Sequence, residues 1–288
     1  MKKIYLDARR RHQQGIALIA VLWIVAALSI IVTGVVHSVR SELRLINHTR
    51  QAVEGLALGE AAIALILQDI SVRPERPTRF TQMDVAYLGH AMQVEIIPLS
   101  GLIDLNSAPE PLLASLYAVA GAKDAAVAAA LAEATVQVRS ERDARGREKG
   151  FEAAQDLLRV PEFDFDLYAR LSPLITAEAQ GSGGKVNPQA APKEVLAVLA
   201  QGNLALAGDL AMQRANGAAD IDTTGLNAPF IANIASSRYK LQARVALADG
   251  MQVVVSRSID LRPDSRTGLP WRIFNAEYWT QAVPRTGV

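Results

Sequence analysis

The longest pattern along the chain is an apolar stretch with a helical repeat near the N-terminus. Residues 15–36 contain no charged side chain, and apolar residues recur at helical spacing as far as residue 70. A charged segment broken by two prolines follows at residues 71–77 and predicts the end of this helix. At about 1.5 Å per residue, the uncharged run is ~33 Å long, which is enough to cross the hydrocarbon core of a bilayer. We therefore expect a transmembrane segment at residues 16–38, followed at residues 39–100 by the helix extension and the first part of a folded body.

A second pattern, the alternation typical of β-strands, occurs after this helix and again towards the C-terminus. Residues 90–97 predict a strand that is closed by Pro98. Residues 239–248 and 251–261 predict two more strands on either side of Asp249-Gly250. Both residues of this pair tolerate positive φ, so the pair favours a tight type I′ hairpin turn.

The stretch between these strands has a different character. Residues 101–228 are rich in alanine and leucine, are periodic at helical spacing and are punctuated by proline and glycine. Two more short helices are predicted at residues 151–161 and 168–176. The order of strand, helices and strands predicts an α+β body, in which residues 101–228 are an inserted helical domain and residues 229–288 supply the C-terminal strands and tail.

Composition narrows the classes of function. The chain has 288 residues, half of them hydrophobic, and no cysteine, which excludes disulfides, thiolate metal sites and thiol nucleophiles. Its four histidines are scattered, and neither a nucleophile elbow nor a paired-histidine zinc motif occurs. We therefore expect a protein that is not an enzyme.

Charge is distributed unevenly and predicts an orientation in the membrane. Residues 1–15 carry five basic side chains and one acidic side chain, whereas the remaining residues carry 25 basic and 28 acidic side chains. Cations on the N-terminal side of a membrane segment favour a cytoplasmic N-terminus and an exported remainder. The net acidic charge after residue 15 opposes binding to nucleic acid.

The junction between the basic stretch and the apolar run resembles the leader of type IV prepilins. It reads Gln13-Gln14-Gly15 and is followed at once by Ile16. In that family a prepilin peptidase cleaves after the glycine, on the cytoplasmic side, and methylates the new N-terminus. The resemblance implies that residues 1–15 are removed, that Ile16 becomes N-methylated and that the helix stays in the membrane. A plain uncleaved membrane anchor is the alternative.

One position departs from the pattern of most pilin-like subunits. They carry a glutamate five residues into the mature chain, where it offsets the terminal ammonium of a neighbouring subunit within lipid. Here that position is Ala20. Because a buried charge without its partner is costly, a subunit that lacks this glutamate suits a special location rather than the repeating shaft.

Several phrases of the middle region occur in the order found in the minor pseudopilin K family of the type II secretion system (general secretion pathway protein K). These phrases lie at residues 104–109, 151–161, 171–176 and 186–188. The resemblance implies a pilin-like long N-terminal helix that packs on a small antiparallel sheet, with a large all-helical domain inserted between the strands. The family usually has an acidic phrase that contains tryptophan. Residues 138–143 stand in its place here and contain no tryptophan.

The same resemblance implies a function in assembly. The protein is expected to be a single-pass inner-membrane protein with a periplasmic head that joins two other minor pseudopilins at the pseudopilus tip. There it would prime or cap assembly for the export of folded proteins from the periplasm. The prepilin peptidase and the inner-membrane secretion platform are further implied partners. Two alternatives stay open, namely a minor pilin of a type IV pilus and a membrane-anchored helix-hairpin-helix DNA receptor.

The resemblance also implies calcium, because the family binds it, but it does not fix the ligands. Carboxylates are the side chains that calcium prefers, and the weak candidates in this sequence are Glu141, Asp143, Asp156, Asp164 and Asp166. Asp164 and Asp166 also suit the start of a helix, where carboxylates favour the amide end.

Overall fold

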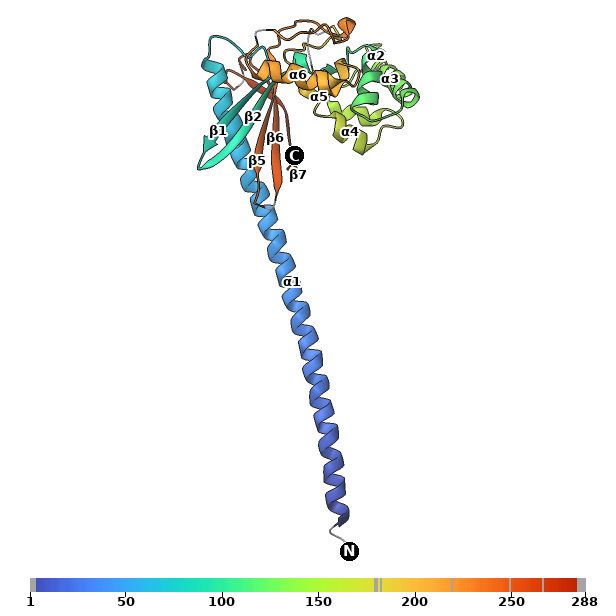
Figure 1. Ribbon diagram of the computed structural model, residues 1–288, viewed down its shortest axis with the longest axis vertical. Helices are drawn as coiled ribbons and strands as arrows, with labels where there is room; N and C mark the ends of the chain where they lie inside the picture. The colour runs from blue at the N-terminus through green and yellow to red at the C-terminus, as the bar shows by residue number, and fades with distance from the viewer. Residues whose placement is uncertain are drawn as a thin grey trace. The chain divides into compact units, whose positions relative to one another are not determined.

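A computed structural model of the chain describes residues 4–178, 181, 183–218, 220–248, 250–265 and 267–283. The chain divides into two compact units, Met1–Glu54 and Gly55–Val288, which are described separately. The helix α1 (Ile4–Val72) contributes to both units (Figure 1). The predicted long helix and its end within the charged segment are therefore confirmed.

The first unit is the N-terminal part of α1. From residue 18 to residue 34 every side chain is exposed, and the large apolar ones include Trp23, which is 72% exposed, and Ile30, which is 73% exposed. A helix that is apolar on all sides with nothing packed against it is typical of a membrane segment. The side chains of residues 4–17 lie outside the described residues.

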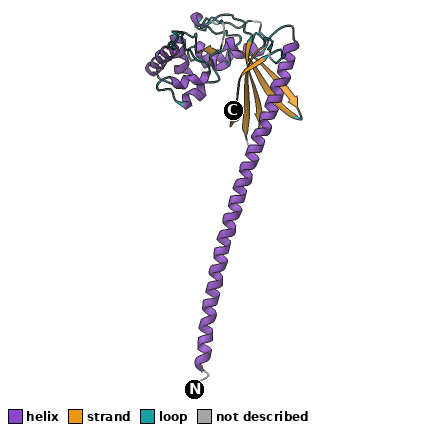
Figure 2. Ribbon diagram, turned by 180° about the vertical axis from the view of Figure 1, so that it is seen from behind, coloured by secondary structure: helices purple, strands orange, loops and turns teal. Residues whose placement is uncertain are grey.

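The second unit is built on an antiparallel sheet with the strand order β1-β2-β5-β6-β7 (Figure 2). Its strands are β1 (Thr81–Tyr87), β2 (His90–Pro98), β5 (Arg238–Ala246), β6 (Met251–Asp260) and β7 (Arg272–Ala282). The sequence predicted β2, β5 and β6 to within two residues. In the predicted turn between β5 and β6, Gly250 has the positive φ that was expected, at +77°. The other turn residue, Asp249, lies outside the described residues.

The last turns of α1 pack on one face of this sheet. Ile63, Ile66 and Leu67 share a hydrophobic core with Leu241 of β5 and Val255 of β6. Because side chains alternate along a strand, the other face of β5 carries polar residues.

Two glycines allow α1 to approach β6 closely. A Cβ added to Gly59 would lie 2.5 Å from Cγ2 of Val255, and one added to Gly55 would lie 2.9 Å from Cγ2 of Val253. Both distances are shorter than a normal carbon contact. These glycines are therefore sites of close packing. Nearby, Nη2 of Arg257 forms an ion pair with Oε1 of Glu60 at 2.5 Å.

We expect Gly59→Ala to lower the free energy of unfolding by about 1 to 3 kcal/mol, because the added methyl group overpacks the helix against the sheet. Gly208 is a matched control on another helix, where an added Cβ would come no closer than 3.7 Å to Lys193. There Gly208→Ala is expected to stabilise the protein by about 0.5 to 1 kcal/mol through helix propensity. Urea unfolding measures both changes, and equal stabilisation by the two substitutions would contradict the close packing at Gly59.

A mostly helical segment lies between β2 and β5 in the chain. Its helices are η1 (Leu99–Gly101), α2 (Glu110–Val119), α3 (Ala125–Arg139), η2 (Ala154–Arg159), α4 (Phe165–Leu171), α5 (Lys193–Leu199), α6 (Leu204–Ala215) and η3 (Ala228–Phe230). The short strands β3 (Ile103–Asp104) and β4 (Ile175–Thr176) also lie in this segment and pair in parallel. The segment was predicted to be all-helical, and these two strands show that it is not. That it forms a separate domain stays a prediction.

The two short helices expected within this segment differ from the prediction. The first is the 3₁₀ helix η2, which is shorter than residues 151–161. The second, α4, begins at Phe165 and ends before Pro173, whose missing N–H cannot continue the helical hydrogen bonds. The residues expected at its end, Ile175 and Thr176, form β4 instead, as suits β-branched side chains.

The structure also bears on where the chain can cross a membrane. Among the residues that the structure describes, the stretch Ile46–Val72 is long and apolar enough to cross a membrane, judged by length and composition alone. However, 44% of its most apolar part is buried within the protein. Leu18–Gly34 is a shorter apolar stretch, and its side chains are exposed. Side chains that already form a protein core are not free to face lipid, so the exposed stretch is the better membrane segment.

Candidate functional site

The residues expected to be processed lie on α1. Gly15 and Ile16 have helical backbone, but their side chains lie outside the described residues, so the leader and its cleavage stay predictions. Ala20 is exposed, and no charged residue lies between residues 18 and 34. The structure therefore places Ala20 within an uncharged apolar surface.

Two of the phrases contain an asparagine, and the first asparagine phrase, residues 104–109, begins at the end of β3 and joins three segments of the helical region. Nδ2 of Asn106 donates to the carbonyl oxygens of Phe151 (2.9 Å) and Ala177 (2.8 Å). Oδ1 of Asn106 accepts a hydrogen bond from the backbone N–H of Phe151 at 2.8 Å. Both protons of the amide group and its oxygen are thus used to hold the fold together.

The second asparagine phrase, residues 186–188, holds the helical segment to the region before β5. Asn187 is 2% exposed; its Nδ2 donates to the carbonyl oxygen of Ile234 at 2.9 Å, and its Oδ1 accepts from the N–H of Gln189 at 3.0 Å. Its backbone N–H donates to the carbonyl oxygen of Ser100 at 2.7 Å. Both asparagines therefore have structural roles.

We expect Asn187→Ala to lower the free energy of unfolding by about 2 to 4 kcal/mol, because it leaves the half-buried carbonyl oxygen of Ile234 and the half-buried N–H of Gln189 without their partners. Asn203 supplies a control, since its exposed side chain only caps α6 by accepting from the N–H of Leu206. Asn203→Ala is expected to cost about 1 kcal/mol. Equal losses of unfolding free energy, measured by urea unfolding, would show that the hydrogen bonds of Asn187 contribute no more to stability than a helix cap does.

The hairpin between α2 and α3 is the element that a DNA receptor would use. The N–H of Gly121 donates to the carbonyl oxygen of Leu116 at 3.2 Å, and that of Lys123 donates to Tyr117 at 3.1 Å. Nζ of Lys123 lies 3.9 Å from a carboxylate oxygen of Asp164. Amides and a cation that are engaged within the protein offer little to a phosphate.

The candidate calcium ligands are used within the protein. Asp164 caps α4, where its Oδ1 accepts from the N–H of Leu167 at 2.6 Å, and Asp166 follows in the first turn. Oδ2 of Asp156 accepts from the backbone amides of Glu152 and Ala153.

The two remaining candidates lie beyond α3. Asp143 accepts from the backbone amides of Arg147 and Arg145, which hold the pKa of its carboxyl below the ordinary value, and Glu141 forms an ion pair with Lys149 at 3.5 Å. Across the described part of the chain, no three acidic or histidine side chains gather as metal ligands do. Calcium binding stays a prediction without an assembled ligand set.

A buried lysine connects the sheet to the helical segment. Nζ of Lys240 on β5 donates to the carbonyl oxygen of Ser172 at the end of α4, at 3.0 Å. Burial lowers the pKa of Lys240, and Glu277 opposes this shift. The folded protein therefore binds this proton less tightly than the unfolded chain does.

The lowered pKa of Lys240 predicts a pH dependence that a substitution can isolate. Below the folded-state pKa, burying the charge costs stability, and this cost is relieved as the pH rises towards the ordinary value of 10.5. Lys240→Met is therefore expected to be more stable than the wild type at pH 7, with a difference that shrinks at pH 9.5. Urea unfolding at both values tests this expectation, which a difference independent of pH would contradict.

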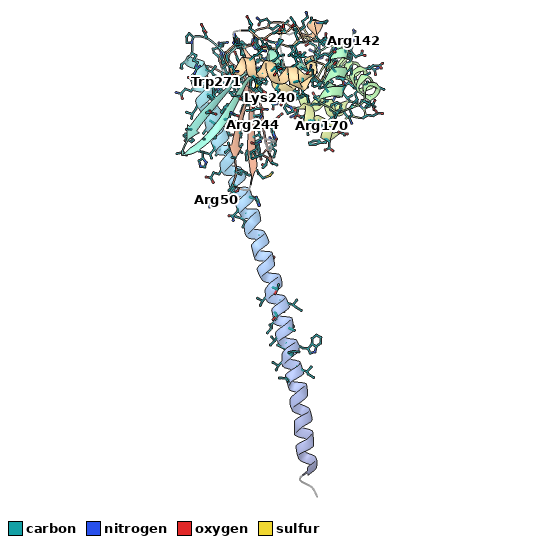
Figure 3. All side chains as sticks on the ribbon, viewed as in Figure 1. Arg50, Arg142, Arg170, Lys240, Arg244 and Trp271 are labelled. Carbon is teal, nitrogen blue, oxygen red and sulfur yellow. The ribbon has the colours of Figure 1, made fainter. Side chains whose placement is uncertain are left out.

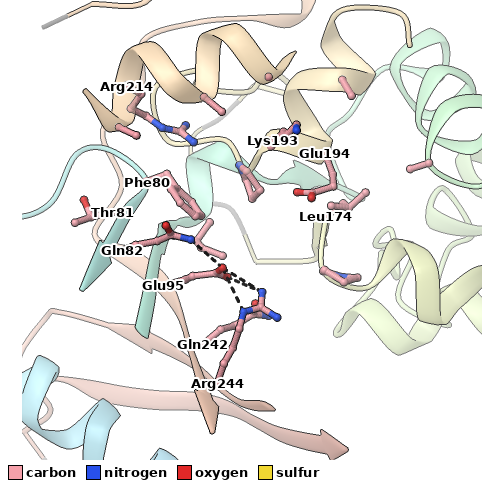
Figure 4. A pocket seen from close by; sticks show the side chains of 18 of the residues that line it. Phe80, Thr81, Gln82, Glu95, Leu174, Lys193, Glu194, Arg214, Gln242 and Arg244 are labelled. Atoms are coloured by element: carbon pink, nitrogen blue, oxygen red, sulfur yellow. Dashed lines mark hydrogen bonds and ion pairs between the residues drawn. The ribbon is translucent and has the colours of Figure 1, made fainter. Parts of the chain in front are cut away.

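A cleft that the sequence did not predict lies on the sheet face that does not pack on α1. It has a volume of about 1050 Å³ and lies between the sheet and the helices α5 and α6 (Figure 4). On its floor, Glu95 forms an ion pair with Arg244 at 3.0 Å. The signal that was available is the alternation along β5, where Lys240, Gln242 and Arg244 occupy the positions between apolar residues.

No protein-family model and no curated protein matches the chain. Among solved structures, the chain is similar to a chain in the crystal structure of the GspK-GspI-GspJ complex from the type 2 secretion system of enterotoxigenic Escherichia coli. The sequence identity is 15% and the TM-score is 0.45, over 84% of this chain and 99% of the other.

Proposed function

We propose that this protein is a minor pseudopilin of a type II secretion system. The observation that carries the proposal is the N-terminal part of α1, where exposed apolar side chains cover residues 18–34 without a charge. This stretch follows five basic residues and the phrase Gln13-Gln14-Gly15. A basic leader that ends in glycine before a membrane helix is the arrangement that a prepilin peptidase processes.

The apolar helix has two uses in this account. Cleavage between Gly15 and Ile16 and N-methylation of Ile16 leave a helix whose surface is stable in the inner membrane, with its start on the cytoplasmic side and the folded body in the periplasm. Once the subunit is extracted, the same apolar surface packs laterally against the helices of other subunits. The role is one of assembly, without enzymatic activity.

Two features support a position at the tip of the pseudopilus. The first is Ala20, which supplies no carboxylate to neutralise the terminal ammonium of a following subunit. An ammonium group without such a partner is costly in lipid, so a subunit that lacks the carboxylate suits a position with no following subunit. The helical segment of residues 101–228 is an insertion that would clash between stacked subunits. In this position the protein joins two other minor pseudopilins and primes or caps assembly on the inner-membrane platform for the export of folded proteins.

Co-purification separates this function from that of a minor pilin in a type IV pilus, which shares the leader. The tagged full chain, cross-linked in membranes and purified in detergent, is expected to carry the two other minor pseudopilins of the secretion system. An unrelated single-pass protein with the same tag is the control. Recovery of type IV pilus subunits in place of the pseudopilins would contradict the proposal.

A DNA receptor is tested separately by titrating duplex DNA at moderate salt. We expect no binding, because Lys123 and the hairpin amides already have partners within the protein. Duplex binding that is lost in Lys123→Ala would favour the receptor.

A further inference from the structure

The cleft described above is large enough for a polypeptide segment. Its volume of about 1050 Å³ lies at the upper end of the range of about 300 to 1,000 Å³ that is typical of small-molecule pockets. Its floor is the polar face of the sheet, and one wall is formed by α5 and α6 (Figure 4). The floor and the walls belong to the same compact unit.

A buried amide without a partner lines this cleft. Gln242 on β5 is 3% exposed, and its Nε2 atom has no hydrogen-bond partner among the residues that the structure describes. A buried donor that is left unsatisfied costs about 1 to 3 kcal/mol. A site that keeps such a donor is suited to a ligand that brings a carbonyl oxygen.

The charge of the cleft indicates the sign of its ligand. The charged lining residues are five basic and two acidic side chains: Arg79, Arg170, Lys193, Arg214, Arg244, Glu95 and Glu194. Arg244 is paired with Glu95, and Arg214 donates to backbone carbonyl oxygens, including that of Ala191 at 2.6 Å. Within the described ranges, the side chains of Lys193 and Arg170 have no hydrogen bond or ion pair, so they are available to an anion.

The wall formed by α6 also exposes apolar side chains to the cleft. Leu204 is 67% exposed and Met212 is 60% exposed, and both line it. Figure 3 places Arg170 on α4 and Arg244 on the sheet, so charged residues reach the cleft from separate elements. The cleft is therefore suited to a ligand that combines carboxylates with apolar side chains.

We propose that the cleft binds an extended acidic segment of a partner polypeptide. Carboxylates of the segment pair with Lys193 and Arg170, a backbone carbonyl oxygen accepts from Nε2 of Gln242, and an apolar side chain packs on Leu204 and Met212. This inference goes beyond the proposed function in assembly and does not rest on it.

The test uses the full chain in nonionic detergent and two labelled peptides. One is acetyl-Gly-Asp-Leu-Glu-Leu-Asp-Gly-amide, and the other has lysine at each acidic position. Fluorescence anisotropy is expected to show saturable binding of the acidic peptide alone, weakened by added salt because charges are screened. Lys193→Glu is expected to weaken binding about tenfold, as the reversal of a pairing charge does.

Further variants separate the cleft from general charge effects. Arg170→Glu is expected to weaken binding to a similar extent from another element, whereas Gln242→Leu is expected to weaken it about fivefold through the lost hydrogen bond. Lys185→Glu is the matched control, because Lys185 is exposed and does not line the cleft. It is expected to bind the acidic peptide as the wild type does, apart from a small effect of net charge.

Several results would overturn the proposal. These are no saturable binding of the acidic peptide, equal binding of both peptides, or a loss in Lys185→Glu as large as that in Lys193→Glu. Competition by N-acetylaspartate at the same concentration as the peptide would also overturn it, by showing a site for small anions. Thermal unfolding of each exposed-residue variant checks that it is folded.

Discussion

Replacing Gly15 by leucine is expected to leave residues 1–15 attached to the chain and to abolish secretion through the system. A residue without a Cβ lets a protease approach the backbone at the membrane edge, whereas a bulky side chain at the cleaved bond blocks this approach. Immunoblots of membranes are expected to show a change from fully processed to fully unprocessed protein. Export of the secreted proteins, measured in the medium, is expected to fall to the level of a deletion strain.

The neighbouring residue supplies the control for this experiment. Gln14→Ala changes the leader at a position that is not at the cleaved bond and is expected to be processed and to support secretion. Normal cleavage and export in the Gly15→Leu variant would contradict the assignment of the leader.

Two charges in the middle of the apolar run are expected to release the protein from the membrane. Arginine at the centre of a membrane helix costs about 2.5 to 3.5 kcal/mol on insertion scales, so Val25→Arg with Leu28→Arg costs about 5 to 7 kcal/mol by the same estimate. Both side chains are exposed on α1, so the body of the protein keeps its core. We expect the double variant to move from the carbonate-resistant membrane fraction to the soluble or degraded fraction.

A second pair of charges distinguishes this membrane segment from the other apolar stretch of α1. Ile46 and Val53 are also exposed but lie in Ile46–Val72, the stretch whose apolar window is partly buried. Ile46→Arg with Val53→Arg is expected to leave the protein in the membrane. Release by this pair, with retention of the Val25 and Leu28 variant, would contradict the span at residues 16–38.

The elements that the sequence predicted well are those with long and regular apolar patterns. β5 and β6 bury most of their side chains, and β5 alternates polar and apolar residues. The long helix has an uninterrupted helical repeat. The strands β1 and β7 were missed because they form the edges of the sheet, where few side chains are buried and the apolar signal is weak. β7 has no buried residue at all.

The asparagine phrases were recognised as phrases, but their chemistry needed the structure. Asn106 bonds to Ala177, 71 residues away, and Asn187 bonds to Ile234, 47 residues away, and no local pattern contains such a partner. The cleft was missed for the same reason, because its walls come from segments that are distant in the chain. Only the polar alternation along β5 indicated that its second face is not a core.

The N-terminus of the mature protein tests the central claim most directly. Mass spectrometry of the chain purified from its native membrane is predicted to find Ile16 as the first residue, carrying one methyl group on its nitrogen. A polypeptide that still begins at Met1 would contradict the account, because an uncut chain is a plain membrane anchor and has not been prepared to enter a pseudopilus.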